Sequence, residues 1–192
     1  NPLVDPETGE VLHGGNFYGG HACFALDALK TAVANLADLV DRQIALVCNQ
    51  DTNAGLPANL CGRVGPDRAA HHGFKAMQIS ASALTAEALK LTMPASVFSR
   101  STECHNQDKV SMGTIAARDC LRIVGLTETV AVIGLLAMCQ AVDLRGGHNV
   151  HQRARALHAA VRARVPMVDA DRRQDLDIAE VLALHRSGAL PA

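Results

Sequence analysis

Residues 101–113, with the sequence STECHNQDKVSMG, bring a dense mixture of reactive side chains into one short stretch. Two carboxylates, a lysine, a histidine, a cysteine and two amides lie between residues 103 and 109. Carboxylates, imidazoles and amines can transfer protons, and amides can orient a small polar molecule. Ordinary surface loops rarely carry so many functional groups without filler residues, so this stretch is the first candidate for chemistry.

A metal centre and a cysteine nucleophile explain these residue types less well. The neighbouring pairs Cys104–His105 and His71–His72 point to different sides of the chain, and no second ligand pair follows at a zinc-like interval. Cysteine-protease sites draw their cysteine, histidine and asparagine from distant segments. We therefore expect no metal ion.

Two other stretches also have simple interpretations. The glycine-rich residues 14–20, GGNFYGG, lack the spacing and the preceding strand of a dinucleotide or phosphate loop. A group of arginines near the C-terminus is interpreted as a solvated helix surface: Arg153, Arg155, Arg162, Arg164, Arg172 and Arg173.

The composition indicates one globular domain or a large part of one. The chain has 192 residues, of which 48% are hydrophobic and 19% charged, and its net charge is −1. The near-neutral charge and an aromatic content of 3% favour no nucleic-acid partner. The longest apolar run, Val130–Cys139, is about half of a bilayer span, so we expect no membrane partner. Six scattered cysteines without a CxxC motif indicate a reducing compartment, and we expect a cytoplasmic protein.

The candidate residues must be positioned by helices, which the spacing of the apolar residues predicts. Apolar residues recur at three- and four-residue steps from Gly20 to about Asn49, and further helices are predicted at about Asp67–Leu91, Gln107–Leu144, Val150–Arg164 and Asp175–His185. The third of these is apolar on nearly all sides between Val130 and Val142, which predicts a buried central rod. No strand pattern of useful length occurs. The predicted fold is all-α, a bundle of long helices.

The N-terminal segment is different in character. It opens directly into turn-forming pairs, NPLVDPETGEVLHGGN, which predict an irregular, hairpin-like segment. We expect the chain to be part of a longer protein. Its predicted organisation is an active-site loop segment at residues 1–20, a central long-helix bundle at 21–145 and a C-terminal helical tail at 146–192.

Three separated stretches resemble one known family in order and spacing. They are NPLVDPETGEVLHGGNFYGG (1–20), GFKAMQISASALTAE (73–87) and STECHNQDKVSMGTIAAR (101–118). Together they are similar to the C-terminal part of the aromatic amino acid ammonia-lyases and the related aminomutases. A polar helix N-terminus would account for Asn106 or Asp108 but not for the other two motifs.

This resemblance implies a helical homotetramer whose active sites combine segments of more than one subunit. It also implies a methylideneimidazolone prosthetic group, formed from an internal Ala-Ser-Gly that this chain does not contain. The family's catalytic tyrosine and carboxylate-binding arginine would likewise lie upstream. We therefore expect this 192-residue chain to be inactive alone and to need the N-terminal part of the same protein.

By the same resemblance, Glu103, Gln107 and Phe17 are the catalytic residues. Glu103 and Gln107 are four positions apart, so they would share one face of a helical turn and face the amine and the electrophile. Phe17 would pack near the prosthetic group, and the glycines around it would allow close approach of the backbone.

The resemblance also assigns substrate binding to Asn1, Lys75 and Asn106. Asn1 would face the substrate carboxylate, and Asn106 lies beside Gln107. Lys75 would pair with Glu103 and adjust its ionisation.

The substrate is expected to be a small aromatic amino acid. Histidine ammonia-lyases typically carry Gln-Glu in place of Asn106-Gln107 and an apolar residue in place of Lys75, whereas phenylalanine and tyrosine enzymes carry HNQD and GFK, as here. An amide at residue 107 removes a charge that would favour an imidazole ring. We expect elimination of ammonia from Phe or Tyr rather than His, with an aminomutase or a catalytically inactive scaffold as alternatives.

Overall fold

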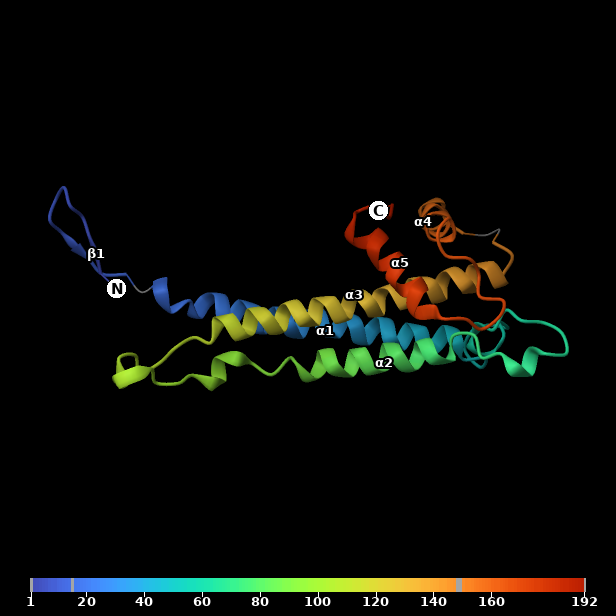
Figure 1. Cartoon of the computed structure of the whole chain (residues 1–192), viewed down its shortest axis with the longest axis horizontal. Helices are drawn as coiled ribbons and strands as arrows, with labels where there is room; N and C mark the ends of the chain where they lie inside the picture. The colour runs from blue at the N-terminus through green and yellow to red at the C-terminus, as the bar shows by residue number, and fades with distance from the viewer. Residues whose placement is uncertain (1, 15, 148–149, 192) are drawn as a thin grey trace.

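Three long helices form a bundle that runs the length of the molecule (Figure 1). The computed structural model describes residues 2–14, 16–147 and 150–191. Helices α1 (Gly20–Cys48) and α3 (Gly113–Leu144) run in the same direction, and α2 (Lys75–Lys90) runs back alongside them. The shorter helices α4 (Gln152–Arg162) and α5 (Gln174–Arg186) pack near the C-terminal half of α3. The predicted all-α fold is confirmed.

The N-terminal segment forms a small hairpin that projects from the bundle (Figure 1). Its strands β1 (Leu3–Val4) and β2 (Val11–Leu12) pair antiparallel, which confirms the hairpin-like prediction. Single-turn 3₁₀ helices occur in the connections: η1 (Asn16–Tyr18), η2 (Ala58–Leu60), η3 (Arg68–Ala70), η4 (Ala95–Phe98) and η5 (Glu103–His105).

Two helix starts differ from the prediction. The second helix was expected from about Asp67 but begins at Lys75, because Gly73 has a φ of 55° and lies against the backbone of another loop. A Cβ on Gly73 would stand 2.7 Å from the carbonyl oxygen of Asn59. The third helix was expected near Gln107 but begins at Gly113, after Met112 in a left-handed conformation. The ends of α1, α4 and α5 lie within two residues of the prediction.

The core is centred on the second half of α3. Val130, Ile133 and Ala137 are fully buried, and they pack in one cluster with Ala37 of α1 and Ala81 of α2. The close contact of α1 with α3 depends on a glycine: a Cβ at residue 134 would stand 2.8 Å from Cγ1 of Val40. The predicted buried rod is confirmed.

Helix α3 also has the length and composition of a membrane-spanning helix. Half of its most apolar window is buried inside the chain, as in the core helix of a bundle.

Four cysteines serve as small apolar residues within the helices. Cys23, Cys48, Cys120 and Cys139 are buried and free, whereas Cys104 is exposed in the loop before α3. Burial raises the pKa of Cys48 to about 12 and that of Cys139 to about 11, so both thiols stay protonated at neutral pH.

Candidate active site

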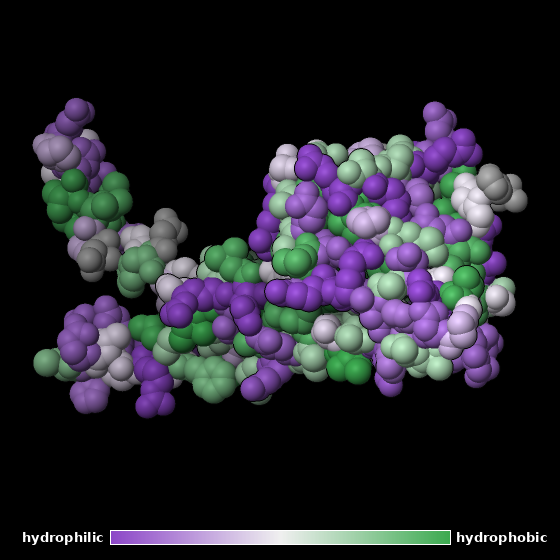
Figure 2. Space-filling model, turned by 45° about the vertical axis from the view of Figure 1, so that its right-hand side comes forward, coloured by the Kyte–Doolittle hydropathy of each residue, from purple (hydrophilic) through white to green (hydrophobic). Residues whose placement is uncertain are grey.

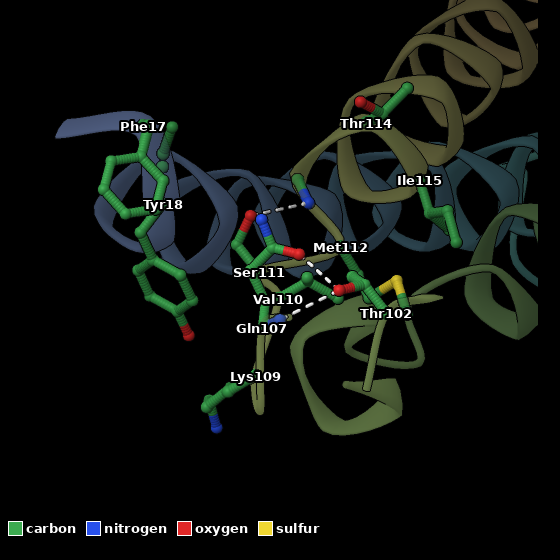
Figure 3. A pocket seen from close by; sticks show the side chains of 13 residues that line it. Phe17, Tyr18, Thr102, Gln107, Lys109, Val110, Ser111, Met112, Thr114 and Ile115 are labelled. Atoms are coloured by element: carbon green, nitrogen blue, oxygen red, sulfur yellow. Dashed lines mark hydrogen bonds between the residues drawn. The ribbon is translucent and has the colours of Figure 1, made fainter. Parts of the chain in front are cut away.

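A pocket of about 580 Å³ lies at the end of the bundle where α1 and α3 both begin (Figure 3). This volume is in the range of small-molecule sites. The pocket is lined by η1, the first turns of α1 and α3, and the loop before α3, with the residues Phe17, Tyr18, Gly19, Ala22, Thr102, Gln107, Lys109, Val110, Ser111, Met112, Gly113, Thr114 and Ile115.

Both helices enter the pocket through left-handed residues. Gly19 precedes α1 with a φ of 65°, and Met112 precedes α3 with a φ of 61°. Neither helix carries an acidic residue in its first turn. Two parallel helix dipoles therefore direct their positive ends into the pocket, and Lys109 adds a full charge. The pocket favours anionic groups.

Tyr18 and Phe17 shape the aromatic side of the pocket. The Tyr18 ring lies so close to Gly20 that a Cβ there would be 2.2 Å from its Cε1 atom. A glycine at this position therefore leaves room for the Tyr18 ring, whereas the expected approach of the backbone near Phe17 to a prosthetic group stays a prediction. Phe17 itself is 70% exposed, so its ring is available to another molecule or segment.

Gln107 is held by reciprocal hydrogen bonds with Thr102 (Figure 3). The Gln107 amide N–H donates to Oγ1 of Thr102 at 2.9 Å, and the Thr102 amide donates to the Gln107 carbonyl oxygen at 3.1 Å. The Thr102 hydroxyl, which already accepts one bond, donates to Oε1 of Gln107. Among the bonds within the described ranges, Nε2 of Gln107 makes none, so this N–H group can donate to a ligand.

A buried ion pair holds the segment that leads into the pocket. Nζ of Lys30 lies 2.9 Å from Oδ1 of Asp27 and donates to the Met93 carbonyl oxygen at 2.7 Å. The Asp27 carboxylate accepts the amides of Ala95 at 3.0 Å and Ser96 at 3.1 Å. Burial alone would raise the pKa of Asp27, but Lys30 and these amides outweigh it and lower the pKa to about 2.

The loop between these residues and α3 is closed by one further bond. The amide of Val110 donates to Oγ of Ser99 at 3.0 Å. The loop of residues 99–110 is therefore closed at its base, three residues after Ser96, which limits where Gln107 can lie.

The structure brings only part of the predicted site together. Phe17 and Gln107 line the same pocket, whereas Glu103 and Asn106 are exposed on the adjacent turn and lie outside the lining. The expectation that Glu103 and Gln107 share a helical face is wrong, because Cys104 has a φ of 49° and the helix starts only at Gly113. Asn1 lies outside the described residues.

Helix α2, which begins with Lys75, starts at the end of the bundle opposite to the pocket (Figure 1). It is the first residue of α2, whose 16 residues span about 24 Å before the chain returns toward Glu103. No ion pair joins Lys75 to Glu103 within residues 2–14, 16–147 and 150–191. The pairing does not form within one chain, and between residues of different copies it stays a prediction.

Several pocket residues were not anticipated. Thr102, Lys109 and Ser111 line the pocket, yet only their position beside the HNQD motif marked them in the sequence. Throughout the described part of the chain, no group of three or more His, Cys, Asp or Glu residues is arranged to hold a metal ion.

Comparison with known proteins places this geometry in a family. The sequence model of the family described as aromatic amino acid lyase matches residues 1–163. A histidine ammonia-lyase of Aromatoleum aromaticum is 42% identical over 94% of this chain and 34% of its own length. A tyrosine ammonia-lyase of Cupriavidus metallidurans is 39% identical over 99% of this chain and 35% of its own length.

Solved structures give the same result. The tyrosine aminomutase of Streptomyces globisporus is 36% identical with a TM-score of 0.90, over 98% of this chain and 35% of its own. The histidine ammonia-lyase of Trypanosoma cruzi is 34% identical with a TM-score of 0.89, over 98% of this chain and 36% of its own. The chain spans about a third of the length of these relatives, and it belongs to the aromatic amino acid lyase family.

Proposed function

We propose that the complete protein eliminates ammonia from an aromatic L-amino acid and releases a trans-aryl acrylate, with this chain supplying part of the active site. The observation that carries the proposal is the pocket itself. It brings Phe17 and the free Nε2 group of Gln107 to the positive ends of two helices. An aromatic ring, a neutral hydrogen-bond donor and a region favouring anions match the parts of such a substrate.

The reaction removes a weakly acidic β-proton together with a poor leaving group. A methylideneimidazolone, expected from an Ala-Ser-Gly in the N-terminal part of the protein, would supply the electrophile that activates the amine. The residues present fit such a group, because Phe17 offers a flat ring to a conjugated ring. The helix ends and Nε2 of Gln107 would hold the group, and they would stabilise negative charge that develops in the pocket during the reaction. Glu103 would move a proton at the amine nitrogen.

The opposite positions of Lys75 and Glu103 support a site shared between copies. Because α2 separates these residues by most of its length, Lys75 of one copy would face Glu103 of another. Four leucines on the outer face of α1 remain 46–57% exposed and follow steps of seven, three and seven residues: Leu29, Leu36, Leu39 and Leu46. This spacing suits packing against another helix and supports a homotetramer. Figure 2 shows hydrophobic side chains exposed among hydrophilic ones on the face of the molecule in view.

The residue at position 107 is the basis for a preference for Phe or Tyr over His. Its neutral amide gives no charge to attract an imidazolium ring, whereas the known relatives include both histidine and tyrosine enzymes. The free cysteines are compatible with a cytoplasmic location.

An aminomutase is the second candidate, since tyrosine aminomutases are among the similar structures with a TM-score of 0.90. It would convert the same substrate into its β-amino acid. Assaying the complete protein for both the β-amino acid and the free aryl acrylate distinguishes the two reactions.

The decisive variant for the substrate is Gln107→Glu in the complete protein. A carboxylate can pair with a cationic imidazole but gains nothing from a neutral ring, so the ratio of kcat/KM for His to that for Phe should rise about tenfold. Activity toward Phe and Tyr should fall more than activity toward His. Gln50→Glu, at an exposed turn distant from the pocket, is the matched control. A ratio that stays flat or falls would remove the basis of the substrate assignment, and a wild-type protein without activity on any of the three would contradict the proposed function.

A further inference from the structure

Asp171 lies against the turn that begins α2, although almost one hundred residues separate them in sequence. Its Oδ2 accepts the amide of His72 at 2.8 Å, and its Oδ1 accepts the amide of Gly73 at 2.9 Å. These two amides directly precede Phe74 and Lys75. The family model ends at residue 163, so this contact comes from a part of the chain outside the match.

The contact is reciprocal. The backbone amide of Asp171 donates to Nδ1 of His71 at 3.0 Å. Since a backbone amide can only donate, Nδ1 of His71 accepts with its lone pair. The His72 amide also donates to Oδ1 of Asp171 at 3.1 Å, so four hydrogen bonds join one residue of the C-terminal tail to three consecutive residues before α2.

Among the described residues of α2 itself, no side chain caps the helix and holds the turn before it. Phe74 occupies the N-cap position and makes no side-chain bond to the helix. Gly73, with its φ of 55°, lies tightly against Asn59 and Cys61. A carboxylate near a helix N-terminus also interacts favourably with the helix dipole. The direction in which Lys75 leaves this turn thus depends on a partner from elsewhere in the chain.

The segment carrying Asp171 is itself fixed to the core. Gln140 of α3 is fully buried, and its Nε2 donates to the carbonyl oxygens of Val168 at 2.8 Å and Leu60 at 3.0 Å. Its Oε1 accepts the amide of Val168 at 3.0 Å. Asp171 follows three residues later, so the tail presents its carboxylate from a rigid support.

We propose that Asp171 is a positioning residue that sets Lys75 for the active site. This inference rests on the proposed function for the role of Lys75, but the hydrogen bonds that carry it are independent of any activity. The C-terminal tail then serves catalysis without contacting the substrate.

The test uses the complete protein with Asp171→Ala and Asp171→Asn, and Asp169→Ala as the matched control. Asp169 is exposed two residues away, and within the described part of the chain its carboxylate accepts only the neighbouring amide of Ala170. Asp171→Ala should speed hydrogen exchange of the amides at residues 72–76 about tenfold, with a smaller increase for Asp171→Asn, whose amide keeps one oxygen acceptor. Unchanged exchange in Asp171→Ala would overturn the proposal, whether or not the protein is an ammonia-lyase.

A double-variant comparison distinguishes positioning from general stability. Asp171→Ala should lower kcat/KM about tenfold when Lys75 is present and less than about twofold in a Lys75→Met background. An equal loss in both backgrounds would show that Asp171 does not act through Lys75. A wild-type protein lacking activity would contradict the proposed function instead, and the exchange measurement would still decide whether Asp171 holds the turn.

Discussion

The two ends of the bundle hold the candidate residues in different ways. At the pocket end, Gln107 is fixed mainly by a residue five positions away and by the start of the helix that follows. At the other end, the turn before Lys75 is fixed by Asp171 and indirectly by Gln140. A local motif can therefore be recognised in the sequence at the first end, whereas the second depends on contacts that only the folded chain brings together.

The largest effect is expected at the pocket end from Lys30→Met. Removal of the ammonium leaves Asp27 buried without its cation, and breaking such a pair costs about 4 kcal/mol. Hydrogen exchange of residues 93–112 in the complete protein should report this loss. Arg122→Met, which breaks an exposed pair with Glu87, should cost less than about 1 kcal/mol. Similar losses of free energy in Lys30→Met and Arg122→Met would mean that the buried pair does not hold the loop.

The corresponding change at the other end is Gln140→Leu. It leaves two carbonyl oxygens and one amide without their partner in the core, so we expect a loss of about 3 kcal/mol in the free energy of unfolding. The exposed Gln43→Leu is the control. Urea denaturation of the complete protein measures both, and a Gln140→Leu midpoint equal to wild type would contradict the role assigned to this side chain.

Mixing two inactive variants tests whether Lys75 of one copy lies in the same active site as Glu103 of another copy. Lys75→Ala and Glu103→Ala should each lower activity about 100-fold. If each site takes these residues from different copies, randomly mixed assemblies should regain about a quarter of wild-type activity. Co-expression with separate affinity tags and two-step purification isolates the mixed assemblies. Activity that stays at the level of the single variants would place both residues in one copy.

The smallest expected effect is on the stability of the protein at acidic pH. Because the pKa of Asp27 is lowered from 3.8 to about 2 on folding, its carboxylate stabilises the protein fully above about pH 4 and loses this contribution as the pH falls through 2. The contribution is about 2 kcal/mol. The difference in unfolding free energy between wild type and Asp27→Asn should therefore shrink between pH 5 and pH 2.5. A difference independent of pH would show that ionisation of Asp27 is not what stabilises the loop.

Much of the fold could be predicted because it follows from periodicity. The apolar steps of α1 and the all-round apolar part of α3 determine which faces must be buried. The starts of α2 and α3 could not be predicted, since they depend on left-handed backbone at Gly73 and Met112 that neighbouring segments stabilise.

The site was predictable only in part for the same reason. Phe17 and Gln107 lie in motifs that resemble the family, and both line the pocket. The separation of Lys75 from Glu103 is a property of how α2 crosses the bundle, which no local pattern encodes. Asp171 lies outside any motif, and its contact spans 99 residues.

The length of α2 sets the distance between Lys75 and the loop that carries Glu103. Each added turn would move Lys75 by about 5.4 Å relative to the loop that carries Glu103. Such an insertion would also displace the loops at both ends of α2 along α1 and α3, against which α2 packs (Figure 1). Natural variation in length should therefore be concentrated in the hairpin and the C-terminal helices rather than in α2.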